Sequence, residues 1–175
     1  MSRLRLYLMR HAKSAWDQPE LADFDRPLNE RGRRAASEIG GLMAAKGYAP
    51  ERVLCSNAKR AQETLVGVLG ELPSRPDIIH TRGIYEADTA RLLQLIRISG
   101  GSARALMLIG HNPGMSDLAQ LLSGGGSLAA IGRLQGKFPT AALAVLSFDA
   151  PDWSAIGSGA GRLDAYHTPA RHHGD

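Results

Sequence analysis

Arg10 and His11 are adjacent at the end of an apolar stretch, LRLYLM at residues 4–9. Arg60 follows the stretch RVLCS within SNAKR, and His111 follows ALMLIG within GHNPG. Ligands of open α/β sheets bind beyond the carboxyl ends of the strands, where these side chains would meet. Guanidinium groups hold phosphoryl oxygens in pairs, and an unprotonated imidazole is a nucleophile. The four side chains therefore predict a site for a dianionic phosphoryl group.

Each of these residues also has a structural explanation when it is taken alone. An arginine near a strand end commonly forms a surface ion pair, and a lone histidine is commonly a structural one. Four such residues at equivalent positions favour a site over coincidence. Arg60 adds to this, because it falls in the first turn of a predicted helix, where free backbone N–H groups attract an anion.

Two kinds of segment alternate along the chain and must position these residues. Short apolar runs with the length of strands occur at residues 4–9, 52–56, 77–80, 105–110 and 142–148. Helical patterns occur at 29–47, 57–72, 89–99 and after GHNPG, where Met115, Leu118, Ala119 and Leu122 share one face. Strands alternating with helices predict a three-layer α/β/α sandwich with a mostly parallel central sheet.

The helix boundaries follow from capping residues. Asn29 is the predicted N-cap of the first helix and Gly47 its stop. Asn112 can cap the fourth helix, with Pro113 in its first turn. The Gly-rich segment 123–141 is expected to be a loop.

We expect one main domain at residues 1–150 and a C-terminal segment at 151–175. The second segment is Gly-rich and then polar, so its final residues are expected to be mobile. His172 and His173 in this tail favour a solvated terminus over a metal site.

Composition excludes several classes of protein. The 175 residues are 43% hydrophobic and 22% charged, which is typical of a globular domain. The sequence has no apolar window long enough to span a membrane and no recognisable secretion signal, so a cytoplasmic location is expected, with no membrane partner. Cys55 is the only cysteine, and we expect a buried, inert thiol. A monomer is expected.

The net charge of +4 does not indicate nucleic-acid binding. Acidic residues alternate with basic ones in NERGRRAASE, and aromatic residues make up only 5% of the chain. Clusters of cations and stacking platforms are what nucleic acids require, so no nucleic-acid partner is predicted.

The motifs LMRHAKSAW, SNAKRAQET, IYEAD and GHNPG, in this order, resemble the histidine phosphatase superfamily, the phosphoglycerate mutase-like group. The short chain and the pattern RHAKSxWD, DxDRPLNxRG, GHNPG are similar to the branch of the phosphohistidine phosphatase SixA. The resemblance covers roughly residues 4–150. Ala12 stands where many members carry glycine after the catalytic histidine.

The resemblance implies that His11 is the nucleophile and carries a phosphohistidine intermediate. Arg10, Arg60 and His111 would stabilise the equatorial oxygens during transfer, without a metal or another cofactor. The neighbouring cations Arg10 and Arg60 are expected to keep His11 neutral near pH 7. Ser14 and Asn112 are candidates for further hydrogen bonds to the substrate, although capping explains Asn112 equally well.

Glu86 in GIYEAD lies where many members keep a proton donor for the leaving group, and Asp88 is the competing candidate. A solvated loop carboxylate is the alternative for both residues. An imidazole that leaves from phosphohistidine needs this acid less than an alkoxide does. Seventeen residues separate His11 from Asn29, too few for a deep lid over a small metabolite.

These features predict a phosphatase that acts on phosphohistidine in a partner protein. The alternatives are a phosphatase or mutase of small phosphate esters, and a non-catalytic module that binds phosphate.

Overall fold

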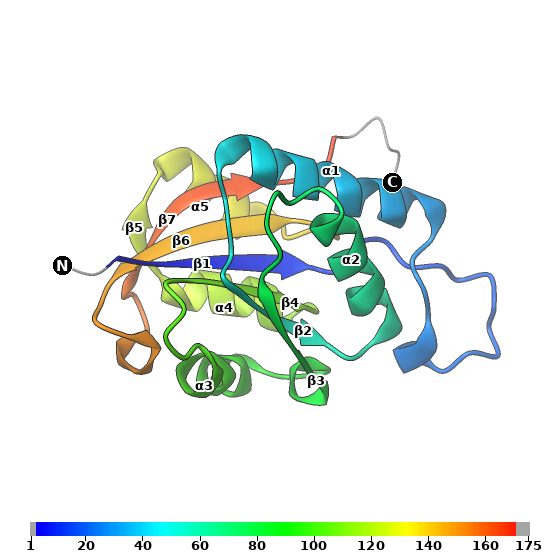
Figure 1. The fold of residues 1–175 in the computed structure, drawn as a ribbon, viewed down its shortest axis with the longest axis horizontal. Coiled ribbons are helices and arrows are strands. Elements are labelled where there is room, and N and C mark those ends of the chain that lie inside the picture. The colour runs from blue at the N-terminus through cyan, green and yellow to red at the C-terminus, as the bar shows by residue number, and fades with distance from the viewer. Residues whose placement is uncertain (1–2, 171–175) are drawn as a thin grey trace.

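Seven strands form one mixed sheet in the computed structural model, which describes residues 3–170 (Figure 1). The order across the sheet is β3-β2-β4-β1-β6-β7-β5. β6 runs antiparallel to β1 and to β7, and the other pairings of the described sheet are parallel. The strands are β1 (Arg3–Arg10), β2 (Arg52–Ser56), β3 (Asp77–Thr81), β4 (Ala105–Gly110), β5 (Ser123–Gly126), β6 (Leu143–Asp149) and β7 (Gly161–His167). The prediction of a mostly parallel sheet is confirmed.

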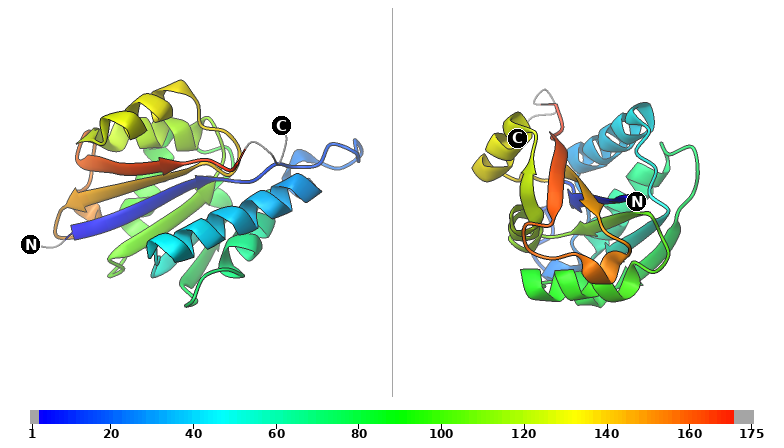
Figure 2. Two further views of the ribbon diagram at one scale, coloured as in Figure 1. Left: turned by 90° about the horizontal axis from the view of Figure 1, so that it is seen from above. Right: turned by 90° about the vertical axis from the view of Figure 1, so that its left-hand side faces the viewer.

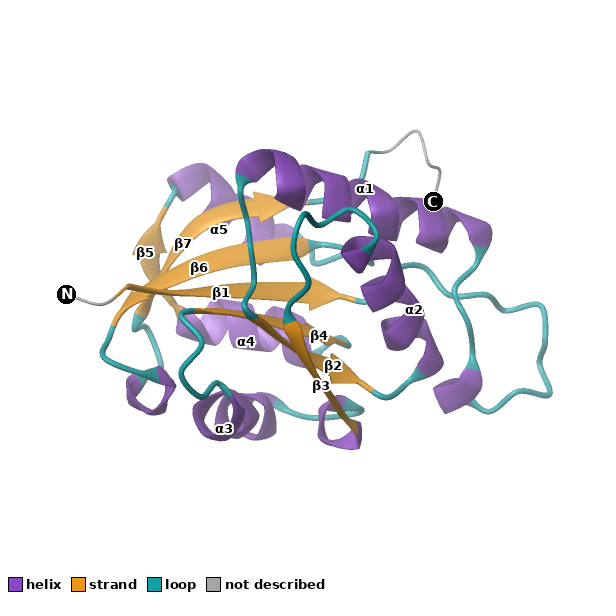
Figure 3. Ribbon diagram, in the orientation of Figure 1, coloured by secondary structure: helices purple, strands orange, loops and turns teal. Residues whose placement is uncertain are grey.

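Helices cover both faces of the sheet, which confirms the predicted three layers (Figures 2 and 3). α1 (Glu30–Lys46) and α2 (Lys59–Leu69) pack on one face. α3 (Thr89–Ser99), α4 (Gly114–Leu122) and α5 (Leu128–Gly136) pack on the other. Three short 3-10 helices complete the elements of residues 3–170: η1 (Asp23–Asp25), η2 (Arg82–Ile84) and η3 (Trp153–Ala155).

β1 lies in the middle of the sheet, which explains its apolar run from Leu6 to Met9. Leu6 and Leu8 belong to the hydrophobic cluster beneath α3, α4 and α5, whereas Tyr7 and Met9 belong to the cluster beneath α1 and α2. Alternate side chains point to opposite faces of a strand, so a strand with both faces covered needs apolar residues throughout. β1 is therefore rigidly held up to its last residue, Arg10.

The first helix begins and ends where the sequence predicts. The Asn29 side chain accepts a hydrogen bond from the backbone N–H of Gly32 at 2.8 Å, and Gly47 adopts the left-handed φ of 72° that ends the helix. The helix continues through Gly40 and Gly41. Gly32 also allows a close approach, because a Cβ there would lie 2.1 Å from the carbonyl oxygen of Lys13.

The prediction of a loop over 123–141 is wrong, because β5 and α5 occupy most of it. Glycine at position 124 marks a close backbone contact and not a flexible turn. A Cβ on Gly124 would lie 2.0 Å from the carbonyl oxygen of Gly159. The Ser127 side chain then caps α5 by accepting from the N–H of Ala130.

Strand β7 lies within the segment 151–175 and was not predicted. It pairs with β6 on one side and β5 on the other, and its Leu163 and Tyr166 side chains are buried. The expectations for the last residues, including His172 and His173, lie outside the described residues. Among residues 3–170, no helix combines the length and the apolar character needed to cross a membrane.

Candidate functional site

Arg10 and His11 lie at the carboxyl end of β1, on the side of the sheet toward which the β1 arrow points in Figure 1. The His11 N–H donates to the carbonyl oxygen of Gly110 at 2.9 Å, and the N–H of Ala141 donates to the His11 carbonyl oxygen at 3.0 Å. The backbone is thereby tied to the end of β4 and to the segment that leads into β6. The His11 side chain is only 6% exposed.

The hydrogen bonds of the His11 ring indicate which of its two nitrogens carries the proton. Nδ1 lies 2.7 Å from the carbonyl oxygen of Ala12, which can only accept a hydrogen bond. The proton of the neutral ring therefore sits on Nδ1. The other nitrogen, Nε2, accepts a hydrogen bond from Nε of Arg60 at 3.3 Å. Nε2 consequently keeps its lone pair, as a nucleophile requires.

Burial lowers the pKa of His11 to about 3. The Ala12 carbonyl opposes this shift, while the charges of His111, Arg60 and Arg10 add to it. The expected neutrality of the ring is confirmed, but its main cause is burial. The positive charges of Arg10 and Arg60, which were predicted to be the cause, contribute less than burial.

Arg60 lies in the first turn of α2, as predicted, and is buried. Its Nη1 donates to the carbonyl oxygen of Asp23 at 2.6 Å, and its Nη2 donates to the Asp23 carboxylate at 2.9 Å. The backbone of this turn is linked to the segment after His11. Thr64 Oγ1 accepts from the N–H of Ala12 at 2.9 Å and donates to the Arg60 carbonyl oxygen at 2.7 Å.

His111 follows β4 directly, and its ring centroid lies 5.2 Å from that of His11. Its Nε2 lies 2.8 Å from Oγ of Ser56, and burial, followed by the charge of Arg60, lowers its pKa to about 4. Nδ1 of His111 and Nε of Arg10 are buried without a hydrogen-bond partner in the described part of the chain. Neither nitrogen is therefore committed to a partner within the described residues.

A cavity of about 340 Å³ opens at this end of the sheet. Its lining consists of basic, imidazole and neutral side chains: Arg10, His11, Lys13, Ser14, Trp16, Arg26, Arg60, His111, Asn112 and Thr140. Six of the predicted site residues thus come together, namely Arg10, His11, Ser14, Arg60, His111 and Asn112. Such a lining suits a multiply charged anion.

Ser14 and Asn112 have structural partners at the cavity. Ser14 Oγ accepts a hydrogen bond from Nη1 of Arg26. The Asn112 side chain donates to the carbonyl oxygen of Phe138 at 2.8 Å and accepts from the N–H of Ser116 at 3.2 Å, in the first turn of α4. The Asn112 side chain thus accepts from the first turn of α4, but the N-cap position is Pro113 and the helix begins at Gly114, so the predicted start, with Asn112 as the cap and Pro113 in the first turn, is wrong by one residue.

Glu86 is exposed and does not line the cavity. Its φ of 59° places it in the left-handed region, directly after Tyr85. The Tyr85 ring contacts the His111 ring edge to face, with centroids 5.4 Å apart. The competing carboxylate, Asp88, is exposed and caps α3 by accepting from the N–H of Arg91 at 2.9 Å. Capping of α3 thus gives Asp88 a structural role. Glu86 is connected to the site only through Tyr85, the residue before it.

Asp23, Arg26 and Trp16 were not predicted as site residues, although the patterns RHAKSxWD and DxDRPLNxRG contain all three. All three lie in the connection between β1 and α1, which extends beyond the strands in Figure 3. Arg26 stacks over the exposed Trp16 ring, with 3.6 Å from its Cζ to the ring centroid. Asp23 contacts Arg60 across 37 positions of the chain, so local spacing carries no signal of the pair.

Residues 3–170 contain no group of three or more His, Cys, Asp or Glu side chains arranged to hold a metal ion.

Three comparisons relate this geometry to known proteins. The family model of the histidine phosphatase superfamily (branch 1) matches residues 6–97. An uncharacterized protein of Mycobacterium tuberculosis (strain H37Rv) is 37% identical over 163 residues, which cover 92% of this chain and 99% of the relative.

Solved structures agree over nearly the whole chain. A protein of Agrobacterium tumefaciens, provisionally named the phosphohistidine phosphatase SixA, is 33% identical with a TM-score of 0.79, covering 95% of this chain and 98% of that one. The protein histidine phosphatase SixA in complex with tungstate is 22% identical with a TM-score of 0.76, covering 95% and 97%. The second likeness is one of fold alone.

Proposed function

Because the chain belongs to the histidine phosphatase superfamily, we propose that it is a metal-independent phosphatase whose phosphoenzyme forms on His11. Its substrate is phosphohistidine on a partner protein. The observation that carries the proposal is the state of His11. Nδ1 carries the ring proton and donates it to the Ala12 carbonyl oxygen. Nε2 has a lone pair that accepts from Nε of Arg60, and Arg60 lines the same cavity as His11.

The reaction has two transfers at phosphorus. In the first, the lone pair of His11 Nε2 forms a bond to phosphorus while the substrate's P–N bond breaks, and the leaving imidazole takes a proton from water. In the second, water attacks phosphorus and the bond to Nε2 breaks. The attacking water loses its proton to solvent, where it neutralises the hydroxide left by the first transfer, and phosphate leaves. Arg10, Arg60 and His111 hold the equatorial oxygens in both transfers.

The shape of the site supports a substrate carried on a protein. Trp16 lines the cavity and is nevertheless 76% exposed, so the mouth opens to solvent. A phosphorylated side chain on another protein can enter such a mouth. The lining is basic or neutral, which suits a leaving imidazole that needs little help from an acid.

Phosphate esters are the competing substrates. An alkoxide leaving group requires a proton donor, and we assign that role to Glu86. Its exposed position beside Tyr85 places it next to the site but outside the lining of the cavity. The proposal therefore predicts that esters are the poorer substrates.

The test compares phosphohistidine proteins with a panel of sugar phosphates and phosphoglycerates, in the presence of a metal chelator. We expect faster turnover of phosphohistidine. Labelled substrate is expected to give an acid-labile, base-stable phosphoenzyme with the wild-type protein and none with His11→Ala. His80→Ala is the matched control, because His80 is exposed on β3.

Comparable turnover of a free ester would assign the protein to small metabolites instead. If the wild type binds phosphate but never forms a phosphoenzyme, and His11→Ala leaves any hydrolysis unchanged, the nucleophilic mechanism is wrong. The protein would then be a non-catalytic phosphate-binding module.

A further inference from the structure

Asp23 is the carboxylate that contacts the candidate site, although its side chain is half exposed. It lies in η1, between β1 and α1. Its two carboxylate oxygens have different partners. Oδ1 accepts from Nη2 of Arg26 at 2.8 Å, and Oδ2 accepts from Nη2 of Arg60 at 2.9 Å and from the Tyr85 hydroxyl at 2.6 Å. One side chain thus joins η1 to α2 and to the segment after η2.

The contacts of Asp23 divide the guanidinium of Arg60 into two edges. Nη1 and Nη2 form the end of the guanidinium, and both donate to Asp23, one to its carbonyl oxygen and one to its carboxylate. Nε lies on the side of the group, where it donates to Nε2 of His11 at 3.3 Å. The remaining N–H of Nη2 is parallel to the Nε–H in a planar guanidinium. A two-pronged donor edge therefore faces His11 while the other edge is anchored.

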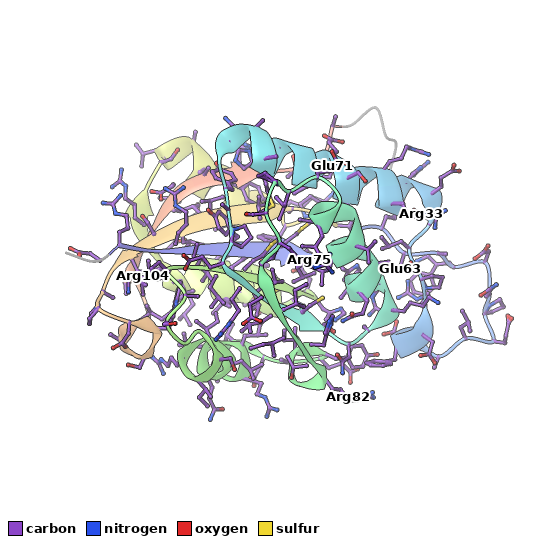
Figure 4. The ribbon with its side chains drawn as sticks, viewed as in Figure 1. Arg33, Glu63, Glu71, Arg75, Arg82 and Arg104 are labelled. Carbon is purple, nitrogen blue, oxygen red and sulfur yellow. The ribbon has the colours of Figure 1, made fainter. Side chains whose placement is uncertain are left out.

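The anchor is charged and is itself held in place. Hydrogen bonds from Arg26 and then Tyr85 keep the pKa of the Asp23 carboxyl well below its usual range. The connection that carries Asp23 is held at Leu28, whose N–H donates to the Glu63 carboxylate at 2.8 Å and whose carbonyl oxygen accepts from Arg33 at 3.2 Å. Figure 4 labels these two partners, Glu63 on α2 and Arg33 on α1.

We propose that Asp23 is a positioning residue that fixes the end of the Arg60 guanidinium, so that its side edge meets the phosphoryl group at His11. The inference rests on the proposed function of this site and names a residue that acts through Arg60. A guanidinium without this anchor has several rotamers, and a misplacement of about 1 Å costs up to about 100-fold in rate.

Asp23→Asn is the first variant, because it keeps the shape of the side chain and removes the charge. We expect kcat on phosphohistidine protein to fall about 10- to 100-fold, with a smaller change in KM. Asp23→Glu, which restores the charge, is expected to recover part of the loss. Asp25→Asn is the matched control, since Asp25 is exposed in the same 3-10 helix, and it is expected to retain wild-type turnover.

A double-mutant cycle with Arg60→Ala separates positioning from a structural effect. If Asp23 acts through Arg60, then Asp23→Asn in the Arg60→Ala background changes kcat less than about twofold, since the two effects are coupled. Additive losses would overturn the inference, and so would wild-type turnover by Asp23→Asn.

The side-chain Nε–H signal of Arg60 in ¹⁵N NMR spectra supplies a readout that does not depend on activity. We expect a protected, shifted signal in the wild type and in Asp25→Asn, and an averaged signal in Asp23→Asn. If the wild type hydrolyses none of the substrates, the proposed function fails, and this signal still decides the positioning role. An unchanged signal in Asp23→Asn contradicts it.

Discussion

Acidification from pH 8 to pH 5 is expected to destabilise the protein through His11 and His111. Both rings are buried and neutral, with their pKa values lowered to about 3 and about 4 from an ordinary value of 6.5. The unfolded chain takes up a proton on each ring as the pH falls below 6.5, whereas the folded protein takes up none until the pH is much lower. Unfolding therefore gains protons in this range, and stability is lost as the pH falls.

The size of the effect follows from the two pKa values of each ring. At pH 5, protonation of the unfolded chain is worth about 2 kcal/mol for each histidine, because pH 5 lies 1.5 units below 6.5, and protonation of the folded state contributes almost nothing. The two rings together lower the free energy of unfolding by about 4 kcal/mol between pH 8 and pH 5. This is a large part of the stability of an ordinary domain.

Urea denaturation at pH 8, 7, 6 and 5 measures this loss in the wild type and in the double variant His11→Gln/His111→Gln. Carboxylates and the other histidines titrate in both proteins. The difference between the two pH dependences therefore gives the contribution of His11 and His111 to the free energy of unfolding. His80→Gln, at an exposed position, controls for the removal of a histidine that is not buried. If the wild type and the double variant lose the same stability to within about 1 kcal/mol, the low pKa values, and with them the argument that burial keeps His11 neutral, are wrong.

Three further changes test local features of the fold and site. Gly32→Ala is expected to destabilise the protein by about 1–3 kcal/mol in urea melts, because its Cβ would meet the Lys13 carbonyl, whereas the Cβ of Gly41→Ala in the same helix would make only an ordinary contact with Glu71, and that change is expected to be neutral or stabilising. Thr64→Val leaves a buried backbone N–H unpaired and is expected to cost about 1–3 kcal/mol in the same assay, with Thr64→Ser close to wild type. Glu86→Gln is expected to change phosphohistidine turnover less than about threefold, and a loss of tenfold or more in steady-state assays would contradict the proposed leaving-group chemistry.

Local patterns predicted the elements that position the site. The apolar run before Arg10, the Asn29 cap and the Gly47 stop identify β1 and α1, since each depends on residues close together in the chain. Cys55 is likewise buried, and burial raises the pKa of its thiol to about 12, as expected for an inert cysteine. The role of the glycines in β5 could not be predicted from local patterns. Gly124 allows a close approach to the Gly159 backbone, and no periodicity in the sequence indicates a contact between residues that far apart.

The same distinction separates the predicted from the unpredicted parts of the site. Arg10, His11, Arg60 and His111 could be placed together from their positions along the chain. Arg10 ends a strand, His11 and His111 directly follow strands, Arg60 lies in the first turn of a helix, and the carboxyl ends of parallel strands lie on the same side of a sheet. The pairing of Asp23 with Arg60 depends instead on how an irregular connection folds over α2.

The low pKa of His11 likewise depends mainly on packing that the sequence does not show. Charges at Arg10 and Arg60 are visible in the sequence, but the desolvation that dominates the shift comes from the packing around the ring. A charge is a property of one residue, whereas desolvation is a property of everything that surrounds it. Removing one neighbouring arginine should therefore leave His11 largely neutral at pH 7, and opening the pocket to water should raise its pKa more than removing either cation.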